Sequence, residues 1–279
     1  EGLKRHPNIE VVGFAINALD AKQKVLRLRP DVMTCDVQMP GMSGIDFLKE
    51  LLPQYPVPTV LVSSLNLGVF DALHAGAVDF VRKPDGTESR EQFIQALTAK
   101  VIIAAKARVR GGRSAPEPAP APALQLGRSR IIVGLGASTG GTEATLEVMK
   151  RLPPDIPGMV IVQHMPTGFT QMYAERLNRL CSMEVREAKN GDEIRPGLAL
   201  VAPADLQCRV QRTAAGGYFV SCTPGDKVSG HRPSVDALFD SMAENVRCPM
   251  VGIIMTGMGA DGAKGLLKMR QKGAFTIGQ

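Results

Sequence analysis

The chain has 279 residues, of which 44% are apolar and 22% are charged, and its formal net charge is +6. This composition is typical of folded globular proteins and excludes a mostly disordered chain, and the length favours two domains over one. No stretch approaches the roughly 20 apolar residues of a membrane-spanning helix, so we expect no membrane insertion.

The first part of the chain alternates short apolar runs with helical patterns. A helix is predicted to begin at Ser89, because Ser89 and Gln92 have the spacing of a capping box. Strand–helix alternation favours a parallel sheet covered on both faces, which predicts an α/β fold. The runs predicted as strands are Glu10–Phe14, Asp31–Cys35, Thr59–Ser63 and Asp79–Arg82.

Polar residues stand at the ends of three of these strands. Asp36 follows the second run, Ser63 ends the third and Lys83 follows the fourth. Because the carboxyl ends of parallel strands meet at one edge of a sheet, we expect the three side chains to converge there. A carboxylate can accept a phosphoryl group whose oxygens a hydroxyl and an ammonium bind. Taken singly, Asp36 could equally be a loop or helix-cap carboxylate and Lys83 a surface lysine.

Three motifs around Asp36, Ser63 and Lys83 occur in the same order as in response-regulator receiver domains, and this part of the chain resembles that family, which has a flavodoxin-like fold. The resemblance covers residues 1–106 and implies that Asp36 is the phospho-acceptor, Ser63 the switch hydroxyl and Lys83 the lysine that contacts the phosphate. It also implies a chemotaxis histidine kinase as phosphodonor. The motifs are DVQMPGMSG at 36–44, VSS at 62–64, and Gly76-Ala77 followed by Lys83-Pro84.

Receiver domains bind Mg²⁺ through the phospho-acceptor and an acidic pair that ends their first strand. No counterpart of that pair precedes Asp36, because the sequence begins inside the expected first helix. Asp36 and the backbone carbonyl of Gln38 are then the only expected Mg²⁺ ligands. Mg²⁺ is usually held by a few carboxylates together with water and phosphate oxygens. We therefore expect a receiver domain shortened at its N-terminus, with weak Mg²⁺ binding and little phosphorylation.

A proline-rich stretch separates the two parts of the chain. Residues 111–127 (GGRSAPEPAPAPALQLG) alternate Pro with Ala or Glu, which excludes a helix or a paired strand and favours an extended spacer. We place a linker at 107–129, between domains at 1–106 and 130–279. Aromatic residues are 4% and Trp is absent, so we interpret the basic residues here as solvated flanks rather than a nucleic-acid site. They are Lys106, Arg108, Arg110, Arg113, Arg128 and Arg130.

The second part again reads as alternating strands and helices. A glycine-rich turn follows its first strand, and a helix is predicted over residues 141–152. We predict a second doubly wound parallel sheet, which makes the whole chain α/β with two such domains. The runs predicted as strands are Ile131–Leu135, Met159–Gln163, Leu198–Val201, Tyr218–Cys222 and Met250–Thr256.

The glycine-rich turn GLGASTGG at 134–141 could serve several chemistries. A dinucleotide fingerprint would need Gly where Thr139 stands, and a P-loop would need Lys where Thr142 stands. The pattern GxSxG is satisfied by 136–140 and would expose the Ser138 hydroxyl at a tight strand-to-helix turn, beside backbone N–H groups able to bind an oxyanion. The same sequence also fits a glycine-rich helix N-terminus that binds a phosphate or has no ligand.

A serine nucleophile needs a base and an orienting carboxylate. His164 follows the strand 159–163, so it is expected at the same sheet edge as Ser138, and Asp261 lies in the glycine-rich loop after the strand 250–256. His231 is a competing base. The plainer alternatives are a structural strand-end histidine for His164 and a helix cap for Asp261.

The segment 130–279 resembles the catalytic domain of chemotaxis receptor methylesterases, which is Rossmann-like. The resemblance implies Ser138 as nucleophile, His164 as base and Asp261 as orienting acid, with Thr139 and Met258 lining the site and supplying oxyanion donors. The family usually continues beyond Gln279, so we expect a domain shortened at its C-terminus. The matching motifs are GASTGG at 136–141, QHMP at 163–166, AP at 202–203, HRPSVD at 231–236 and TGMGADGA at 256–263.

The resemblance implies an esterase without a cofactor that converts glutamate γ-methyl esters of methyl-accepting chemotaxis receptors to glutamate and methanol, and also deamidates receptor glutamines. The receiver is expected to inhibit the esterase until it is phosphorylated. Five scattered cysteines without a CxxC pair favour a reducing cytoplasm. The alternatives are a response regulator whose output domain binds a ligand or partner without catalysis, and a DNA-binding regulator, although no basic recognition helix follows the linker.

Overall fold

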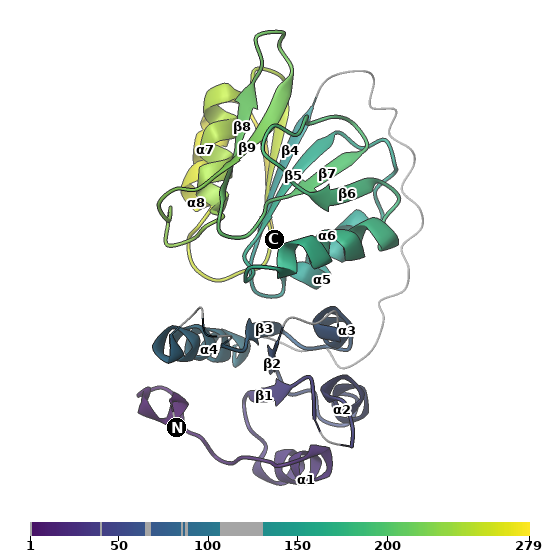
Figure 1. Ribbon diagram of the computed structural model, residues 1–279, viewed down its shortest axis with the longest axis vertical. Coiled ribbons are helices and arrows are strands. Elements are labelled where there is room, and N and C mark those ends of the chain that lie inside the picture. The colour runs from purple at the N-terminus through teal and green to yellow at the C-terminus, as the bar shows by residue number, and fades with distance from the viewer. Residues whose placement is uncertain (1, 40, 65–67, 85, 87–88, 107–130) are drawn as a thin grey trace. The chain divides into compact units, whose positions relative to one another are not determined.

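The computed structural model describes residues 2–39, 41–64, 68–84, 86, 89–106 and 131–279 (Figure 1). The chain divides into two compact units, Glu1–Pro118 and Ala119–Gln279, and each is described by itself. The linker expected at 107–129 and the first residue of the domain expected at 130–279 lie outside the described residues. The domain boundaries therefore stay predictions.

The first unit contains a three-stranded parallel sheet in the order β1-β2-β3. Asp36 pairs with Val62, and Ser63 pairs with Arg82, so the carboxyl ends of the strands lie at one edge. The elements are η1 (Leu3–Arg5), α1 (Ala18–Leu28), β1 (Met33–Asp36), α2 (Gly44–Leu51), β2 (Thr59–Ser63), α3 (Gly68–His74), β3 (Asp79–Arg82) and α4 (Arg90–Ala104).

Helices cover both faces of this sheet, with α4 on one face and α2 and α3 on the other (Figure 1). Helix α4 buries Leu97 and Val101 in one cluster with Val60 of β2. The helix begins where the sequence predicts, because Ser89 Oγ accepts the Gln92 N–H while Gln92 Oε1 accepts the Ser89 N–H. This reciprocal capping satisfies backbone donors that the first turn leaves unpaired.

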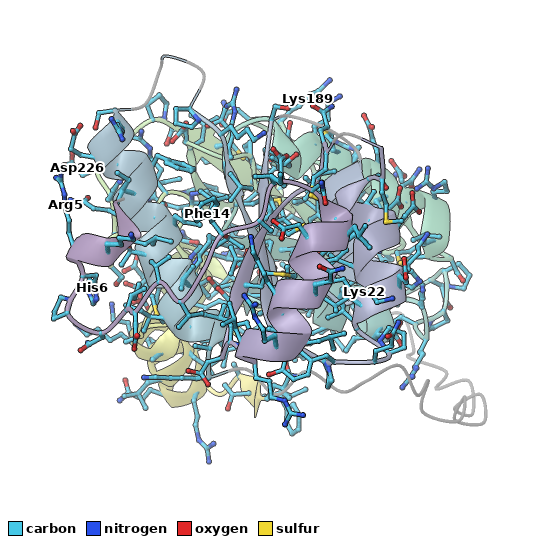
Figure 2. All side chains as sticks on the ribbon, turned by 90° about the horizontal axis from the view of Figure 1, so that it is seen from below. Arg5, His6, Phe14, Lys22, Lys189 and Asp226 are labelled. Atoms are coloured by element: carbon cyan, nitrogen blue, oxygen red, sulfur yellow. The ribbon has the colours of Figure 1, made fainter. Side chains whose placement is uncertain are left out.

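The prediction of a strand at Glu10–Phe14 is wrong: these residues form no strand in the structure. Among the described residues β1 pairs with β2 alone, and a cavity of about 560 Å³ lies between the 9–17 segment and β1. Without a neighbouring strand the segment makes no ladder hydrogen bonds, whatever its apolar pattern. Phe14 of this segment is 80% exposed, and its side chain is labelled in Figure 2.

The second unit contains a six-stranded parallel sheet in the order β11-β10-β4-β5-β7-β6 and an antiparallel hairpin, β8-β9. Helices α5 and α6 cover one face of the large sheet, and α7 and α8 cover the other (Figure 1). The elements are β4 (Ile132–Ala137), α5 (Gly141–Met149), β5 (Gly158–Gln163), α6 (Phe169–Leu180), β6 (Glu184–Glu187), β7 (Leu198–Val201), β8 (Gln207–Arg212), β9 (Tyr218–Thr223), α7 (Val235–Asn245), β10 (Met250–Ile254), α8 (Ala263–Gln271) and β11 (Phe275–Gly278).

The core of this unit lies between the sheet, α7 and the hairpin. Val160 of β5, Leu200 of β7, Val220 of β9 and Leu238 of α7 are fully buried members of one cluster. Burying side chains of this size stabilises the fold by roughly 1.5–3 kcal/mol each. The central strands are therefore rigid supports for the loops at their ends. In the part of the chain that the structure describes, no helix combines the length and apolar character needed to cross a membrane.

Candidate active site

The candidate site lies where the strand order of the large sheet reverses. Strand β4 is central, the chain continues first to β5 on one side of it, and it returns later to β10 on the other side. Open α/β sheets bind ligands at the carboxyl ends of strands at such a switch point. Ser138 directly follows β4, His164 directly follows β5, and Asp261 lies in the loop between β10 and α8.

The three side chains form one hydrogen-bonded series. His164 Nδ1 lies 3.2 Å from Ser138 Oγ, and His164 Nε2 lies 2.8 Å from Asp261 Oδ2. Backbone bonds fix both partners of the first contact, since the Ser138 N–H donates to the Thr256 carbonyl and the His164 N–H to the Ala137 carbonyl. The structure thus brings together the three residues that the sequence singles out as nucleophile, base and acid.

Asp261 is held by the N-terminus of α7. Its Oδ1 accepts the Ser234 hydroxyl at 2.7 Å and the Asp236 N–H at 3.0 Å, and its Oδ2 accepts the Val235 N–H at 2.8 Å. Burial raises the pKa of this carboxyl, but the hydrogen bonds from His164, Asp236, Ser234 and Val235 outweigh burial and hold the pKa below its ordinary value. Asp261 is therefore ionised at neutral pH.

The ionised carboxylate selects the tautomer of His164. A carboxylate only accepts hydrogen bonds, so Nε2 of His164 carries the proton that it donates to Asp261. Nδ1 is then unprotonated and accepts the hydroxyl proton of Ser138. This is the protonation state that a general base needs before a serine attacks.

His231 lies beside this series and does not face the serine. Its ring stacks on the His164 ring with centroids 3.9 Å apart and planes 1° apart, and its Nδ1 donates to the Ser229 carbonyl. Burial lowers the pKa of His231, and repulsion from His164 lowers it further. Ser138 Oγ is hydrogen-bonded to His164, so the geometry favours His164 over His231 as the base.

The two histidines and Asp261 are also the only candidate metal cluster within the described ranges. Ligand atoms of His164, His231 and Asp261 lie within 4.8 Å of one another. A metal ion binds in the plane of each imidazole, and two parallel stacked rings cannot direct their lone pairs at one ion. Both oxygens of Asp261 are already occupied by hydrogen bonds. The donor set therefore does not fit a metal site.

Thr139 follows the serine in the chain, and Met258 follows a glycine that packs against it. Thr139 is 8% exposed, and its carbonyl accepts the Thr256 hydroxyl at 3.2 Å. Met258 is 49% exposed and follows Gly257, whose Cα lies against Ser138. Thr139 also lies just before the first turn of α5, where the helix dipole favours negative charge.

The sequence motifs did not assign a role to Ser234, although it orients the acid. Ser234 is fully buried at the N-cap of α7, and its hydroxyl accepts the Ala237 N–H while it donates to Asp261. A serine before a helical pattern is a recognisable N-cap signal. Only the fold reveals that this cap also touches Asp261, which is 27 residues away.

The predicted residues of the first unit meet only in part. Lys83 Nζ forms an ion pair with Asp36 Oδ2, and Asp36 Oδ1 accepts the Gln38 N–H at 3.0 Å. The Ser63 hydroxyl instead donates to the Ser64 carbonyl at 2.8 Å. Asp36 and Lys83 are therefore joined at the predicted sheet edge, while Ser63 ends the neighbouring strand with its hydroxyl bonded elsewhere.

Close packing of Gly257 against the serine leads to a first prediction. A Cβ on Gly257 would lie 2.7 Å from Ser138 Cβ, so Gly257→Ala is expected to displace the serine. Because a misplacement near 1 Å costs on the order of 100-fold in rate, we expect at least a tenfold fall in the rate of a reaction that uses the Ser138 hydroxyl. Gly225→Ala is the matched control, since a Cβ there comes no closer than 3.9 Å to any neighbour. Equal activity of the two variants in an ester-hydrolysis assay would contradict this packing argument.

Comparison with known families gives two matches that together cover most of the chain. Residues 133–279 match the CheB methylesterase family. Residues 2–97 match the response regulator receiver domain. The esterase family thus covers the unit that holds Ser138, His164 and Asp261, and the receiver family covers the unit that holds Asp36 and Lys83.

Two relatives align over the whole of this chain, and one solved structure aligns over about half of it. A protein-glutamate methylesterase/protein-glutamine glutaminase of Syntrophomonas wolfei is 51% identical over 100% of this chain and 82% of its own length. One of Salmonella typhimurium is 42% identical over 100% of this chain and 81% of its own length. Among solved structures, the CheB methylesterase catalytic domain of Thermotoga maritima aligns with a TM-score of 0.51 at 37% identity, covering 52% of this chain and 77% of that one.

Proposed function

Because the chain belongs to the CheB methylesterase family and carries a response-regulator receiver domain, we propose that it hydrolyses glutamate γ-methyl esters on chemotaxis receptors through Ser138, His164 and Asp261. The receptor product is glutamate and the released product is methanol. Glutamine side chains of the receptors are the second substrate class, since the relatives are named glutaminases as well as methylesterases.

The geometry supports a two-step acyl transfer. Ser138 Oγ attacks the ester carbonyl while its proton passes to His164 Nδ1, and Asp261 stabilises the imidazolium that forms. Backbone N–H groups of Thr139 and Met258 are proposed to bind the oxyanion, helped by the N-terminus of α5. The alkoxide leaves as methanol with the proton from Nδ1, and water then releases glutamate by the same proton transfers in reverse order. With glutamine the leaving group is ammonia and the acyl-enzyme is identical.

One observation carries this proposal: the continuous series from the Ser138 hydroxyl through His164 to a buried, ionised Asp261. An output domain that only binds a ligand or partner would have no need of a serine whose base is fixed in the correct tautomer. The family match also disfavours this alternative.

The proposed function is tested by measuring methanol released from methylated receptor membranes. The complete chain is expected to release methanol from methylated membranes and ammonia from membranes whose receptors carry glutamine at the same positions. Membranes with glutamate at those positions serve as the control and should release neither. Absence of both products at enzyme concentrations that saturate the substrate would overturn the proposal.

Phosphorylation of the receiver is proposed to regulate the esterase, with Asp36 as acceptor and a chemotaxis kinase as phosphodonor. Receivers generally need Mg²⁺ for phosphorylation, and the described residues around Asp36 offer few ligands for it. Asp36 belongs to no described group of three or more His, Cys, Asp or Glu side chains, and Lys83 and the Gln38 N–H already bind its oxygens. These residues alone do not form a Mg²⁺ site.

We therefore predict that this chain is phosphorylated only weakly by a small phosphodonor such as acetyl phosphate. Intact mass spectrometry after incubation with the phosphodonor and Mg²⁺ should show a phosphoryl group on a minor fraction of the molecules. Asp36→Asn should remove that fraction, because Asp36 is the proposed acceptor. Stoichiometric labelling of the chain, or labelling that survives Asp36→Asn, would contradict this prediction.

The protein is proposed to act in the cytoplasm. All five cysteines are free thiols, and Cys35 and Cys208 are buried. Desolvation raises the pKa of the Cys35 thiol to about 12, so this thiol is unreactive. Free thiols are typical of proteins kept in a reducing compartment.

A further inference from the structure

We infer that Gln163 is a positioning residue for the esterase reaction: its side-chain amide fixes the peptide that joins Ser138 to Thr139, and with it the direction of the Thr139 N–H. The inference rests on the proposed function, in which that N–H binds the oxyanion. Gln163 is the last residue of β5, directly before the base His164.

The amide of Gln163 contacts the backbone of both the nucleophile and the base. Its Nε2 donates to the Ser138 carbonyl at 2.8 Å and to the His164 carbonyl at 3.3 Å. The residue is only 2% exposed, so water does not replace these hydrogen bonds when they break. A buried amide that binds two carbonyls in this way restrains both peptides.

The Ser138 carbonyl is the point through which this restraint acts. A trans peptide is planar, so the Ser138 C=O and the Thr139 N–H point in opposite directions within one plane. Two donors hold the carbonyl, Gln163 Nε2 and the Gly141 N–H at 2.8 Å. Fixing the carbonyl therefore fixes the direction of the N–H, and a donor aligned before the reaction needs no reorganisation when negative charge develops.

The other end of the amide argues against a role in packing alone. Gln163 Oε1 is buried and has no hydrogen-bond partner among the described residues. An unsatisfied buried acceptor is unfavourable, and an apolar side chain of similar size avoids this cost. The buried carbonyl oxygen of Gln163 is therefore unfavourable for stability. A residue with this cost is expected where its NH₂ group has a function.

The test replaces the amide by a thioether of similar size. Gln163→Met keeps the volume and removes both donors, so we expect kcat for methanol release to fall at least tenfold, with KM changed by less than about twofold. Labelling of Ser138 by an organophosphonate ester, which also passes through an oxyanion, should slow in parallel. Ser241→Ala is the matched control: it removes a buried hydroxyl that accepts the Val210 N–H at 2.8 Å, away from the site, and should leave kcat unchanged.

A second variant moves the amide without removing it. A Cβ on Gly141 would lie 2.4 Å from Gln163 Oε1 and 2.6 Å from the Ala137 Cβ, and Gly141 has no positive φ. Gly141→Ala is therefore expected to displace the amide together with the end of β4, and to lower kcat. If Gln163→Met does not fold, an unchanged kcat in Gly141→Ala still overturns the inference.

The outcomes separate this inference from the proposed function. A folded Gln163→Met or Gly141→Ala protein with the kcat of the unmodified chain would overturn the inference, as would a loss confined to KM. An unmodified chain that releases neither methanol nor ammonia would instead overturn the proposed function.

Discussion

Replacing Ser138 with alanine is expected to lower kcat for methanol release by about 10⁵–10⁶-fold, the scale seen when a serine nucleophile is removed from a triad. The reason is that no other group of the described site can form the acyl-enzyme. Ser138 Oγ is the atom hydrogen-bonded to the unprotonated nitrogen of His164. Without it, His164 and the oxyanion donors can assist only a direct attack by water.

The loss must come from chemistry and not from unfolding. Ser138→Ala removes one hydroxyl while the backbone bond from the Ser138 N–H to Thr256 remains, so far-ultraviolet circular dichroism and the thermal midpoint should match those of the unmodified chain. Receptor binding measured by co-sedimentation with membranes should also persist. A folded Ser138→Ala protein that keeps a tenth or more of the activity would exclude Ser138 as the nucleophile.

Replacing Asp261 with asparagine is expected to lower kcat by about 10⁴-fold, as when an amide replaces the acid of a serine triad. Asp261 accepts hydrogen bonds from His164, Ser234, Val235 and Asp236. An amide has one oxygen and one NH₂ group, so it cannot accept all of them. Where the NH₂ group faces His164, it favours the tautomer with the proton on Nδ1, which cannot accept the proton of Ser138.

A carboxylate elsewhere in the same unit provides the control for this change. Asp240 lies on α7 and forms a partly exposed ion pair with Lys268 at 2.7 Å. Asp240→Asn should therefore leave kcat within about twofold of the unmodified value, since exposed ion pairs contribute little to stability. If Asp261→Asn and Asp240→Asn had equal activity in the methanol assay, Asp261 would have no role in orienting the base.

The fold was predictable wherever strands are fully buried. Residues 198–201 are a continuous apolar run, residues 59–63 contain one at 60–62, and both segments are strands in the structure. The segment 10–14 is also rich in apolar residues but forms no strand, because pairing depends on a neighbour that local sequence does not reveal. Strand β8 was not predicted although its partner β9 was, since Gln207 and Arg209 interrupt its apolar pattern.

The site was predictable because its residues follow strands of one parallel sheet. Ser138 and His164 each stand directly after a strand, and sheet topology alone brings such positions together. The contacts of Ser234 and Gln163 could not be predicted, because each depends on how a helix or side chain packs across the sheet. The stacking of His231 on His164 likewise requires the loop before α7 to reach over the site.

The central claim is that Ser138, His164 and Asp261 cleave the acyl–oxygen bond of a receptor glutamyl ester. It is tested most directly by incubating the complete chain with methylated receptor membranes in water enriched in ¹⁸O, and analysing methanol and receptor peptides by mass spectrometry. The account predicts methanol that retains the original ester oxygen, receptor glutamates that each gain one ¹⁸O, and neither product with Ser138→Ala. Methanol that carries ¹⁸O, or the same products from Ser138→Ala, would contradict it.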